Sequence, residues 1–324
     1  MMKIILTAIK ILLKEKSLKM LLFAGKRGAG FIYYELLESD YAIKLDNDRA
    51  SLFWKGKLIF QDKADERVFV AGILHKHGFD IKLLESSIVL SFHNLQVMPQ
   101  NVTDYWILYE LFTRGDYDLL NVKNAIVLDI GANTGISMLY FIRERGAKKV
   151  YGFEPFPKTL EQAKKNLHLN NLNDSQVVLF PFAVGSKDME LEVDYDENRP
   201  GDNSIIEEFR EDTETGQKRG MKKETIMVRR FEDCIEKIRE QNPKEQFCLK
   251  MDCEGCEYEI IDNLIRRDSK IMNTFDEIVI ELHRKNNETL KRWIEKDFVI
   301  TMKKKGNCSL LHGTKKKMQT DSSG

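Results

Sequence analysis

The second half of the chain alternates short apolar runs with segments of helical periodicity. The apolar runs hold few polar residues, which is typical of strands buried on both faces of a parallel sheet. Helical spacing fills the intervals between several of these runs. The alternation predicts a doubly wound α/β fold, whose ligands bind beyond the carboxyl ends of the strands. The predicted strands are 125–130, 149–153, 177–184, 247–252 and 277–282, and the predicted helices are 136–144, 158–169 and 257–267.

The first hundred residues follow a less regular pattern. Residues 2–23 place apolar side chains on one stripe and lysines on the other side, which predicts an amphipathic helix. Such a helix docks on its own protein or a partner subunit, or lies on an anionic membrane surface. The pattern further predicts a hairpin over 51–60, a helix over 64–77, a strand over 87–92, and a helix over 104–114 with Thr103 as its cap.

One stretch interrupts the regular alternation. Residues 195–223 are polar, charged and glycine-bearing. A connection of this length without a clear element is typical of a lid or a disordered insert, so we expect a lid or substrate loop. These patterns divide the chain into an N-terminal helical and mixed α/β extension over 1–100, a main domain over 101–313 and a disordered tail over 314–324.

Composition narrows the class of protein. The 324 residues hold 51 Lys+Arg and 51 Asp+Glu, so no net charge draws the chain to nucleic acid. Five cysteines spread through a chain of this length favour a reducing compartment over a disulfide scaffold. No apolar run approaches the ~20 residues of a membrane span. We therefore expect a cytoplasmic protein, with peripheral membrane contact through residues 2–23 left open.

The densest motif joins a glycine-rich turn to an acidic residue. Asp129, Gly131, Asn133 and Gly135 follow one another in DIGANTG, between a predicted strand and a predicted helix. Glycines are needed where the backbone turns tightly and a ligand comes close. Glu154 ends the next strand, where its carboxylate can accept hydrogen bonds from both ribose hydroxyls of a nucleoside. The two features together predict a nucleoside site.

The glycine spacing favours one nucleoside over the others. A nicotinamide dinucleotide prefers G-x-G-x-x-G, whereas this turn reads G-x-x-x-G. Asp129 would repel a pyrophosphate but suits the sulfonium and ammonium groups of S-adenosylmethionine. A dinucleotide site and a glycine turn without a ligand remain the alternatives.

A second cluster of polar residues lies where later strands end. Asp252 and Glu254 follow one predicted strand, and Glu281 and His283 end the next. Acids and a histidine on one rim form a candidate active site. His283 or Asp252 could deprotonate a hydroxyl acceptor. Alternatively, a divalent cation such as Mg²⁺, held by Asp252, Glu254 or Glu281, could acidify that hydroxyl.

Cys253 and Cys256 form a C-x-x-C pattern within the same cluster. A zinc site needs two further ligands at suitable spacing. Metal binding and redox chemistry therefore stay open, while packing is the expected role of both thiols.

Five segments, taken in their order along the chain, resemble the FkbM family of S-adenosylmethionine-dependent methyltransferases. They are VLDIGANTG, VYGFEP, FAVG, LKMDCEGCE and IVIELH, and the resemblance covers about residues 100–300. The resemblance implies a class I Rossmann-like fold, a mostly parallel seven-stranded sheet. It implies that Asp129, Gly131, Asn133 and Gly135 contact the methionine end of the cofactor or shape its loop. Glu154 would bind the ribose, and Phe182 and Ala183 would lie beside the adenine. Lys250, Asp252 and Glu254 match the family signature.

The resemblance also implies an activity, commonly methylation of hydroxyls on sugars, glycolipids or natural products. We expect an O-methyltransferase whose partner is a hydroxyl-bearing small molecule or glycan, with Asp252, Glu254 and His283 as catalytic residues. Nucleic acid is not expected, because DCEG stands where nucleic-acid N-methyltransferases often carry N/D-P-P-Y/F. The alternatives are an N-linked or small natural-product acceptor, and a nucleoside-binding scaffold without catalysis.

Overall fold

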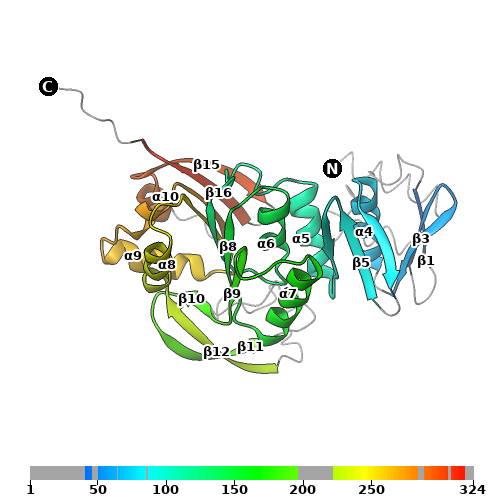
Figure 1. Ribbon diagram of the computed structural model, residues 1–324, viewed down its shortest axis with the longest axis horizontal. Coiled ribbons are helices and arrows are strands. Elements are labelled where there is room, and N and C mark those ends of the chain that lie inside the picture. Colours follow the sequence, from blue (N-terminus) through cyan, green and yellow to red (C-terminus); the bar gives the residue numbers. More distant parts are fainter. Residues whose placement is uncertain are drawn as a thin grey trace.

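A seven-stranded sheet forms the centre of the molecule (Figure 1). The computed structural model describes residues 41–45, 50–63, 65–84, 87–195, 222–283, 288–305 and 308–317. The strand order is β15-β16-β14-β13-β7-β8-β9. Neighbouring strands are parallel from β14 to β9, whereas β16 is antiparallel to both of its neighbours. The strands are β7 (Ile126–Ile130), β8 (Lys149–Phe153), β9 (Val177–Phe180), β13 (Phe247–Met251), β14 (Glu277–His283), β15 (Phe298–Lys305) and β16 (Cys308–Lys315).

The chain order reverses direction between β7 and β13. From β7 the chain adds β8 and β9 on one side, and β13 and β14 lie on the other. In an open α/β sheet, ligands bind beyond the carboxyl ends of the strands at such a reversal. The sheet therefore confirms the doubly wound fold, and it directs attention to the loops that follow β7, β8, β13 and β14.

Helices cover both faces of this sheet (Figure 1). Val127 and Val150 pack into one apolar cluster with α5 and α6, while Leu128 and Ile130 pack into a second cluster with α8 and α9. Successive residues of a strand point to opposite faces, so strands covered on both sides need continuous apolar runs. The helices are α5 (Val102–Phe112), α6 (Ile136–Arg143), α7 (Pro157–Leu169), α8 (Phe231–Gln241), α9 (Cys256–Arg266) and α10 (Glu288–Ile294).

The predicted strand 177–184 is in fact two strands of two sheets. β9 ends at Phe180, and β10 (Ala183–Gly185) pairs instead with β12 (Lys222–Arg230). Pro181 separates the two, because proline lacks the N–H that a strand donates to its neighbour. β11 (Met189–Tyr195) completes this small sheet on the other side of β12. The expected lid or substrate loop, apart from the residues of these strands, lies outside the described residues.

The N-terminal part forms two further sheets around α4 (Asp65–Lys76). The predicted hairpin is confirmed: its turn, Lys55-Gly56, has φ of 48° and 77°, both in the left-handed region. The predicted helix and the predicted strand over 87–92 are also present. The amphipathic segment 2–23 lies outside the described residues. The sheets contain β1 (Tyr41–Leu45), β2 (Ala50–Trp54) and β3 (Lys57–Asp62), and β4 (Asp80–Leu84), β5 (Ser87–Phe92) and β6 (Leu95–Val97).

Apolar packing continues across the expected boundary at residue 100. Leu74 of α4 and Leu95 of β6 belong to the same apolar cluster as Leu108 of α5 and Leu139 of α6. The N-terminal part therefore shares its core with one face of the main sheet. Among the described helices, none combines the length and apolar character that crossing a membrane requires.

Two sequence expectations about chain ends and caps were wrong. Asn101, not Thr103, caps α5: its side chain accepts from the Asp104 N–H, and the Asp104 carboxylate accepts from the Asn101 N–H. Thr103 lies inside the helix because this reciprocal pair starts the helix earlier. Thr314 and Lys315, which we expected in a disordered tail, instead belong to β16 and pair with β15.

Candidate active site

The glycine turn, residues 131–135, takes its shape from close packing. Gly131 has φ of 80°, and a Cβ there would lie 1.8 Å from the backbone oxygen of Asp252. Gly135 has φ of 77°, and its Cβ would meet Ala163 of α7 at 3.3 Å. Asn133, with φ of 48°, accepts the Thr134 N–H through its side chain. Both glycines are therefore needed by the protein itself, and the turn lies directly against the loop after β13.

Asp129 lies beneath this turn in a buried ion pair. Its Oδ1 lies 2.9 Å from Nζ of Lys250, on the neighbouring strand β13, and its Oδ2 accepts from the Ser137 hydroxyl. Burial raises the pKa of Asp129, and the Lys250 charge opposes that rise. Lys250 also donates to the Gly131 carbonyl at 2.7 Å. Lys250 therefore links Asp129 on β7 to the first residue of the glycine turn.

Glu154 follows β8 and contacts the glycine turn directly. Its Oε2 accepts the Asn133 N–H and its Oε1 accepts the Phe156 N–H, each at 3.0 Å. Burial raises the pKa of Glu154 to about 7, although these two N–H groups oppose it. Within the part of the chain that the structure describes, Glu154 has no ion-pair partner. The expected turn and acid are thus brought together at one sheet edge.

Phe182 lies between β9 and the small sheet, and Ala183 is the first residue of β10 in that sheet. The Phe182 ring is 5.7 Å from the ring of Phe153 and 5.3 Å from that of Phe180. Ala183 packs with Phe156 in the apolar cluster of the small sheet. Both residues therefore lie near the ends of β8 and β9, on the side of Glu154.

Four polar side chains from two strand ends meet in what we call the acid–histidine cluster: Asp252, Glu254, Glu281 and His283. Nε2 of His283 lies 3.5 Å from Glu254 Oε1, 3.6 Å from Asp252 Oδ1 and 3.8 Å from Glu281 Oε1. β13 and β14 are adjacent parallel strands, so their carboxyl ends meet at one edge. The structure brings all the expected catalytic residues together.

Glu257, which sequence reasoning did not select, orients the histidine. It is fully buried, and its Oε1 accepts both the His283 backbone N–H at 3.2 Å and the ring Nδ1 at 2.8 Å. Its Oε2 accepts the Gly255 N–H at 3.0 Å. The helix dipole favours an acid in the first turn of a helix. The position of Glu257 in EGCE could therefore be explained without any role in the site.

The cluster holds His283 in its charged form. Burial disfavours the imidazolium, but hydrogen bonds to Glu254 and Glu257 outweigh it and hold the pKa of His283 well above its ordinary value. Burial also disfavours the charged form of Asp252 and so raises its pKa, but the positive charges of Lys250 and His283 lower the pKa overall. An imidazolium has no lone pair for a proton, so in this arrangement His283 donates toward the carboxylates and Asp252 remains ionised.

Glu281 has a different environment from the other acids. Burial and the Asp252 charge raise its pKa to about 7, while Lys305 opposes the rise. Lys305 of β15 donates to Glu281 Oε2 at 2.7 Å. The three expected cation ligands do not form one set among the described residues: Asp252 and Glu254 group with His283, while Glu281 groups with His283 and Cys308.

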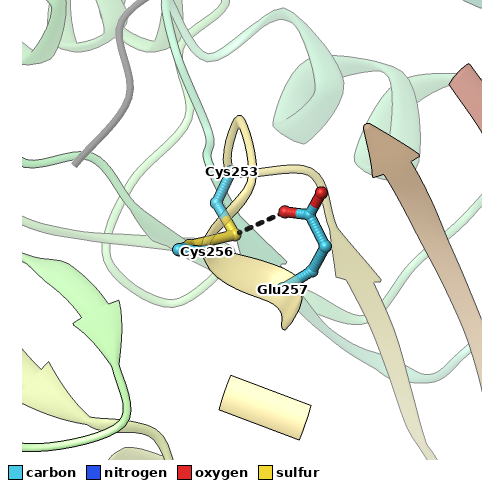
Figure 2. Close-up of side chains that lie close together, drawn as sticks. All are labelled: Cys253, Cys256 and Glu257. Carbon is cyan, nitrogen blue, oxygen red and sulfur yellow. Dashed lines mark hydrogen bonds between the residues drawn. A yellow bond between two sulfur atoms is a disulfide. The ribbon is translucent and has the colours of Figure 1, made fainter. Parts of the chain in front are cut away.

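Cys253 and Cys256 are joined in a disulfide (Figure 2). This corrects the expectation that both would serve as packing thiols. The loop between β13 and α9 brings their Cα atoms within 5.6 Å, a separation that allows the bond. Glu257 lies beside them, its Oε2 at 3.4 Å from Cys253 Sγ.

Comparison with known proteins identifies a family. The model of the "Methyltransferase FkbM domain" matches residues 129–303, which include the glycine turn, Glu154 and the acid–histidine cluster. The chain is similar to methyltransferase sdnD of Sordaria araneosa, with 28% identity over 174 residues, 48% of this chain and 67% of that protein. It is also similar to methyltransferase 1 of Beauveria bassiana, with 25% identity over 187 residues, 53% and 71% of the two chains.

A solved structure gives a more distant match. The crystal structure of methyltransferase FkbM from Methylobacillus flagellatus KT has 16% identity and a TM-score of 0.39. The match covers 65% of this chain and 54% of that one, so this chain spans about half the length of the solved protein. The family model, which covers more than half of this chain, shows that the protein belongs to the FkbM family and is a methyltransferase.

Proposed function

We propose that this methyltransferase transfers the methyl group of S-adenosylmethionine to a hydroxyl of a sugar, glycan or glycolipid. The observation that supports it most is Glu154, a buried acid without an ion-pair partner among the described residues, held by backbone N–H groups beside the glycine turn. Each of its oxygens accepts a single N–H there, so further lone pairs remain for ribose hydroxyls. The residues at this edge therefore fit the cofactor.

Each part of the cofactor has residues to hold it. Glu154 would accept the ribose hydroxyls, and Phe182 with Ala183 would lie beside the adenine. The glycine turn and Asn133 would face the methionine end. When bound, the cofactor supplies a methyl group already activated by its sulfonium, so the protein's task is to align the acceptor for in-line attack.

Asp252 is the group that we assign to receive the acceptor's proton. Its side chain is 26% exposed, whereas that of His283 is 7% exposed. The Tyr117 hydroxyl donates to Asp252 Oδ2 at 3.2 Å and fixes the carboxylate. A low pKa suits this role, because the hydroxyl becomes strongly acidic as its oxygen bonds to the methyl carbon. His283 then orients Asp252 and Glu254.

The chemistry of the cluster favours a hydroxyl acceptor. Asp252 and Glu254 are the more open members, with side chains 26% and 30% exposed. Carboxylates accept hydrogen bonds from hydroxyls and repel phosphates, so sugars suit this rim better than nucleic acid does. The zero net charge of the chain points the same way.

Binding of S-adenosylhomocysteine tests the cofactor assignment. Replacing Glu154 with Ala removes the hydrogen bonds to the ribose, so affinity should fall about tenfold to a hundredfold, the cost of losing charged hydrogen bonds. Isothermal titration measures it. Glu161→Gln, an exposed glutamate on α7, serves as the control and should bind like the wild type. Equal affinity of the wild type and Glu154→Ala would refute the ribose assignment.

The same affinity should depend on pH. Burial raises the pKa of Glu154 to about 7, so the carboxyl group is neutral below that pH and ionised above it. Only the ionised form accepts through both oxygens, so affinity should increase as pH rises through about 7 and then level off. Titrations from acidic to alkaline buffer should show this rise in the wild type and a flat profile in Glu154→Gln. A rise retained by Glu154→Gln would assign it to another group.

The divalent cation remains a separate hypothesis, and we expect catalysis without one. Lys250, Lys305 and His283 already place positive charge around Asp252 and Glu281. Transfer of labelled methyl groups to polar metabolites and glycans of a cell lysate should therefore persist after treatment with a chelator. Activity lost on chelation and restored by Mg²⁺ would instead support the cation.

The same lysate assay separates the enzyme from the alternative of a nucleoside-binding scaffold. An enzyme forms labelled product that depends on the acceptor, whereas a scaffold binds S-adenosylhomocysteine and forms none. Mass-spectrometric comparison of polar metabolites and glycans from cells with and without the gene would then identify the acceptor by its missing methyl group. A product carrying the methyl group on nitrogen would replace the hydroxyl proposal.

A further inference from the structure

The disulfide lies inside the loop that carries two members of the acid–histidine cluster. β13 ends at Met251 and α9 begins at Cys256, so the loop is anchored at both ends. Asp252 and Glu254 flank Cys253 directly. A change in the bonding of the cysteines therefore acts on the segment that positions both carboxylates.

The two sulfur atoms have different surroundings. Cys253 is partly exposed, whereas Cys256 is 2% exposed, with its Sγ 3.8 Å from the Val184 carbonyl. Cys256 is also the first residue of α9, where the helix dipole stabilises a thiolate. An incoming thiolate can therefore reach Cys253 while Cys256 leaves as the stabilised thiolate, which is the asymmetry that fast thiol–disulfide exchange requires.

We propose that Cys253 and Cys256 form a reversible dithiol–disulfide site that exchanges with small-molecule thiols of the glutathione class. In oxidation, the Cys253 thiolate attacks a glutathione disulfide and releases one glutathione thiol. Cys256 then attacks the mixed disulfide and releases the second. Two protein thiols and one glutathione disulfide thus become one protein disulfide and two glutathione thiols. Disulfides in proteins of a reducing compartment are usually transient and serve catalysis or redox sensing, and a reversible site fits this pattern.

Glu257 connects this site to the histidine. Its Oε2 lies 3.4 Å from Cys253 Sγ, and its Oε1 accepts from Nδ1 of His283 (Figure 2 shows the cysteine side). In the disulfide, Cys253 has no proton to donate. After reduction its thiol can donate to Glu257, which adds a donor to the carboxylate that orients His283. Redox state and histidine environment are therefore coupled through one buried side chain.

Reduction also removes the constraint on the loop backbone. Glu254 and Gly255 have φ of 54° and 105°, both in the left-handed region, and the disulfide closes the chain around them. The carboxylates that face His283 belong to this closed form. On the proposed function, we expect reduction to slow methyl transfer by about three- to tenfold, because small displacements of aligning groups are costly.

Thiol labelling tests the site without any need for activity. The full-length protein is equilibrated in mixtures of reduced and oxidised glutathione, quenched with acid, alkylated and digested. The peptide that contains both cysteines should carry two labels in reduced glutathione and none in oxidised glutathione, with mixed disulfide formed only at Cys253. Two labels at every ratio, or none even in reduced glutathione, would overturn the proposal.

A histidine signal tests the coupling. The imidazole resonances of His283, assigned by their loss in His283→Asn, should shift between oxidised and reduced protein. Cys234→Ser, which changes a free cysteine on α8, should keep the shift. The double variant Cys253→Ser, Cys256→Ser should lose it, and unshifted resonances in the wild type would overturn the coupling. Since neither measurement needs methyl transfer, failure here is distinct from a failure to bind S-adenosylhomocysteine.

Discussion

Replacing Lys250 with Met should lower the free energy of unfolding by about 3–5 kcal/mol, the cost of leaving a buried charge without its partner. Lys250 is 3% exposed and Asp129 is fully buried, with 2.9 Å between Nζ and Oδ1. The substitution also removes the donor to the Gly131 carbonyl, so the glycine turn loses its support from below. Denaturation with urea, followed by circular dichroism, measures the change.

A second substitution identifies the cause. Combining Lys250→Met with Asp129→Asn removes the unpaired charge and keeps an oxygen for the Ser137 hydroxyl, so most of the lost stability should return. Lys148→Met provides the control, because Lys148 forms an exposed pair with Glu245 and should contribute less than about 1 kcal/mol. If the double variant is as unstable as Lys250→Met, the buried charge is not what costs stability.

Replacing Asp252 with Asn should reduce turnover by about 10²- to 10⁴-fold, the usual contribution of a positioned proton acceptor. Asn keeps an oxygen for the Tyr117 hydroxyl, so the loop should retain its shape. Labelled methyl transfer gives the rate, and isothermal titration with S-adenosylhomocysteine should give an unchanged affinity. Reduced turnover with unchanged affinity would show that the substitution impairs methyl transfer and not binding of the cofactor.

The control for this experiment lies on the adjacent helix. Asp262→Asn changes an exposed carboxylate of α9 and should leave turnover as in the wild type. Turnover of Asp252→Asn within a fewfold of the wild type would remove Asp252 as proton acceptor. The role would then pass to another member of the cluster, with Glu254 the next most exposed.

Strands buried on both faces were predictable from the sequence, whereas β15, at one edge of the main sheet, was not predicted. β7 and β8 read as continuous apolar runs because helices cover both sides. β15 begins with FVITM, which suits a strand, but it ends in Lys303, Lys304 and Lys305, and most of its residues are exposed, so it lacks the long apolar run of a strand covered on both faces. Only its pairing with β16 defines it as a strand.

The residues that form the candidate site were predictable from the sequence, but their charge states were not. The ends of adjacent strands could be inferred from the alternation, and so could the meeting of Asp252 with His283. The charge state of His283 could not, because it depends on Glu257, a residue of α9 whose carboxylate bonds the ring at Nδ1. The disulfide was missed for a similar reason, since C-x-x-C spacing alone does not tell whether the loop brings two sulfur atoms together.

One amide side chain links the N-terminal part of the protein to the glycine turn. Asn166 of α7 accepts the Met98 N–H through Oδ1 and donates to the Thr134 carbonyl through Nδ2. It thereby bridges the segment after β6 to the turn that we assign to the cofactor. If the N-terminal segments of two relatives were exchanged to alter the choice of acceptor, the glycine turn would therefore be disturbed as well. The exchange would avoid this only if the new segment kept a backbone N–H in place for Oδ1 of Asn166.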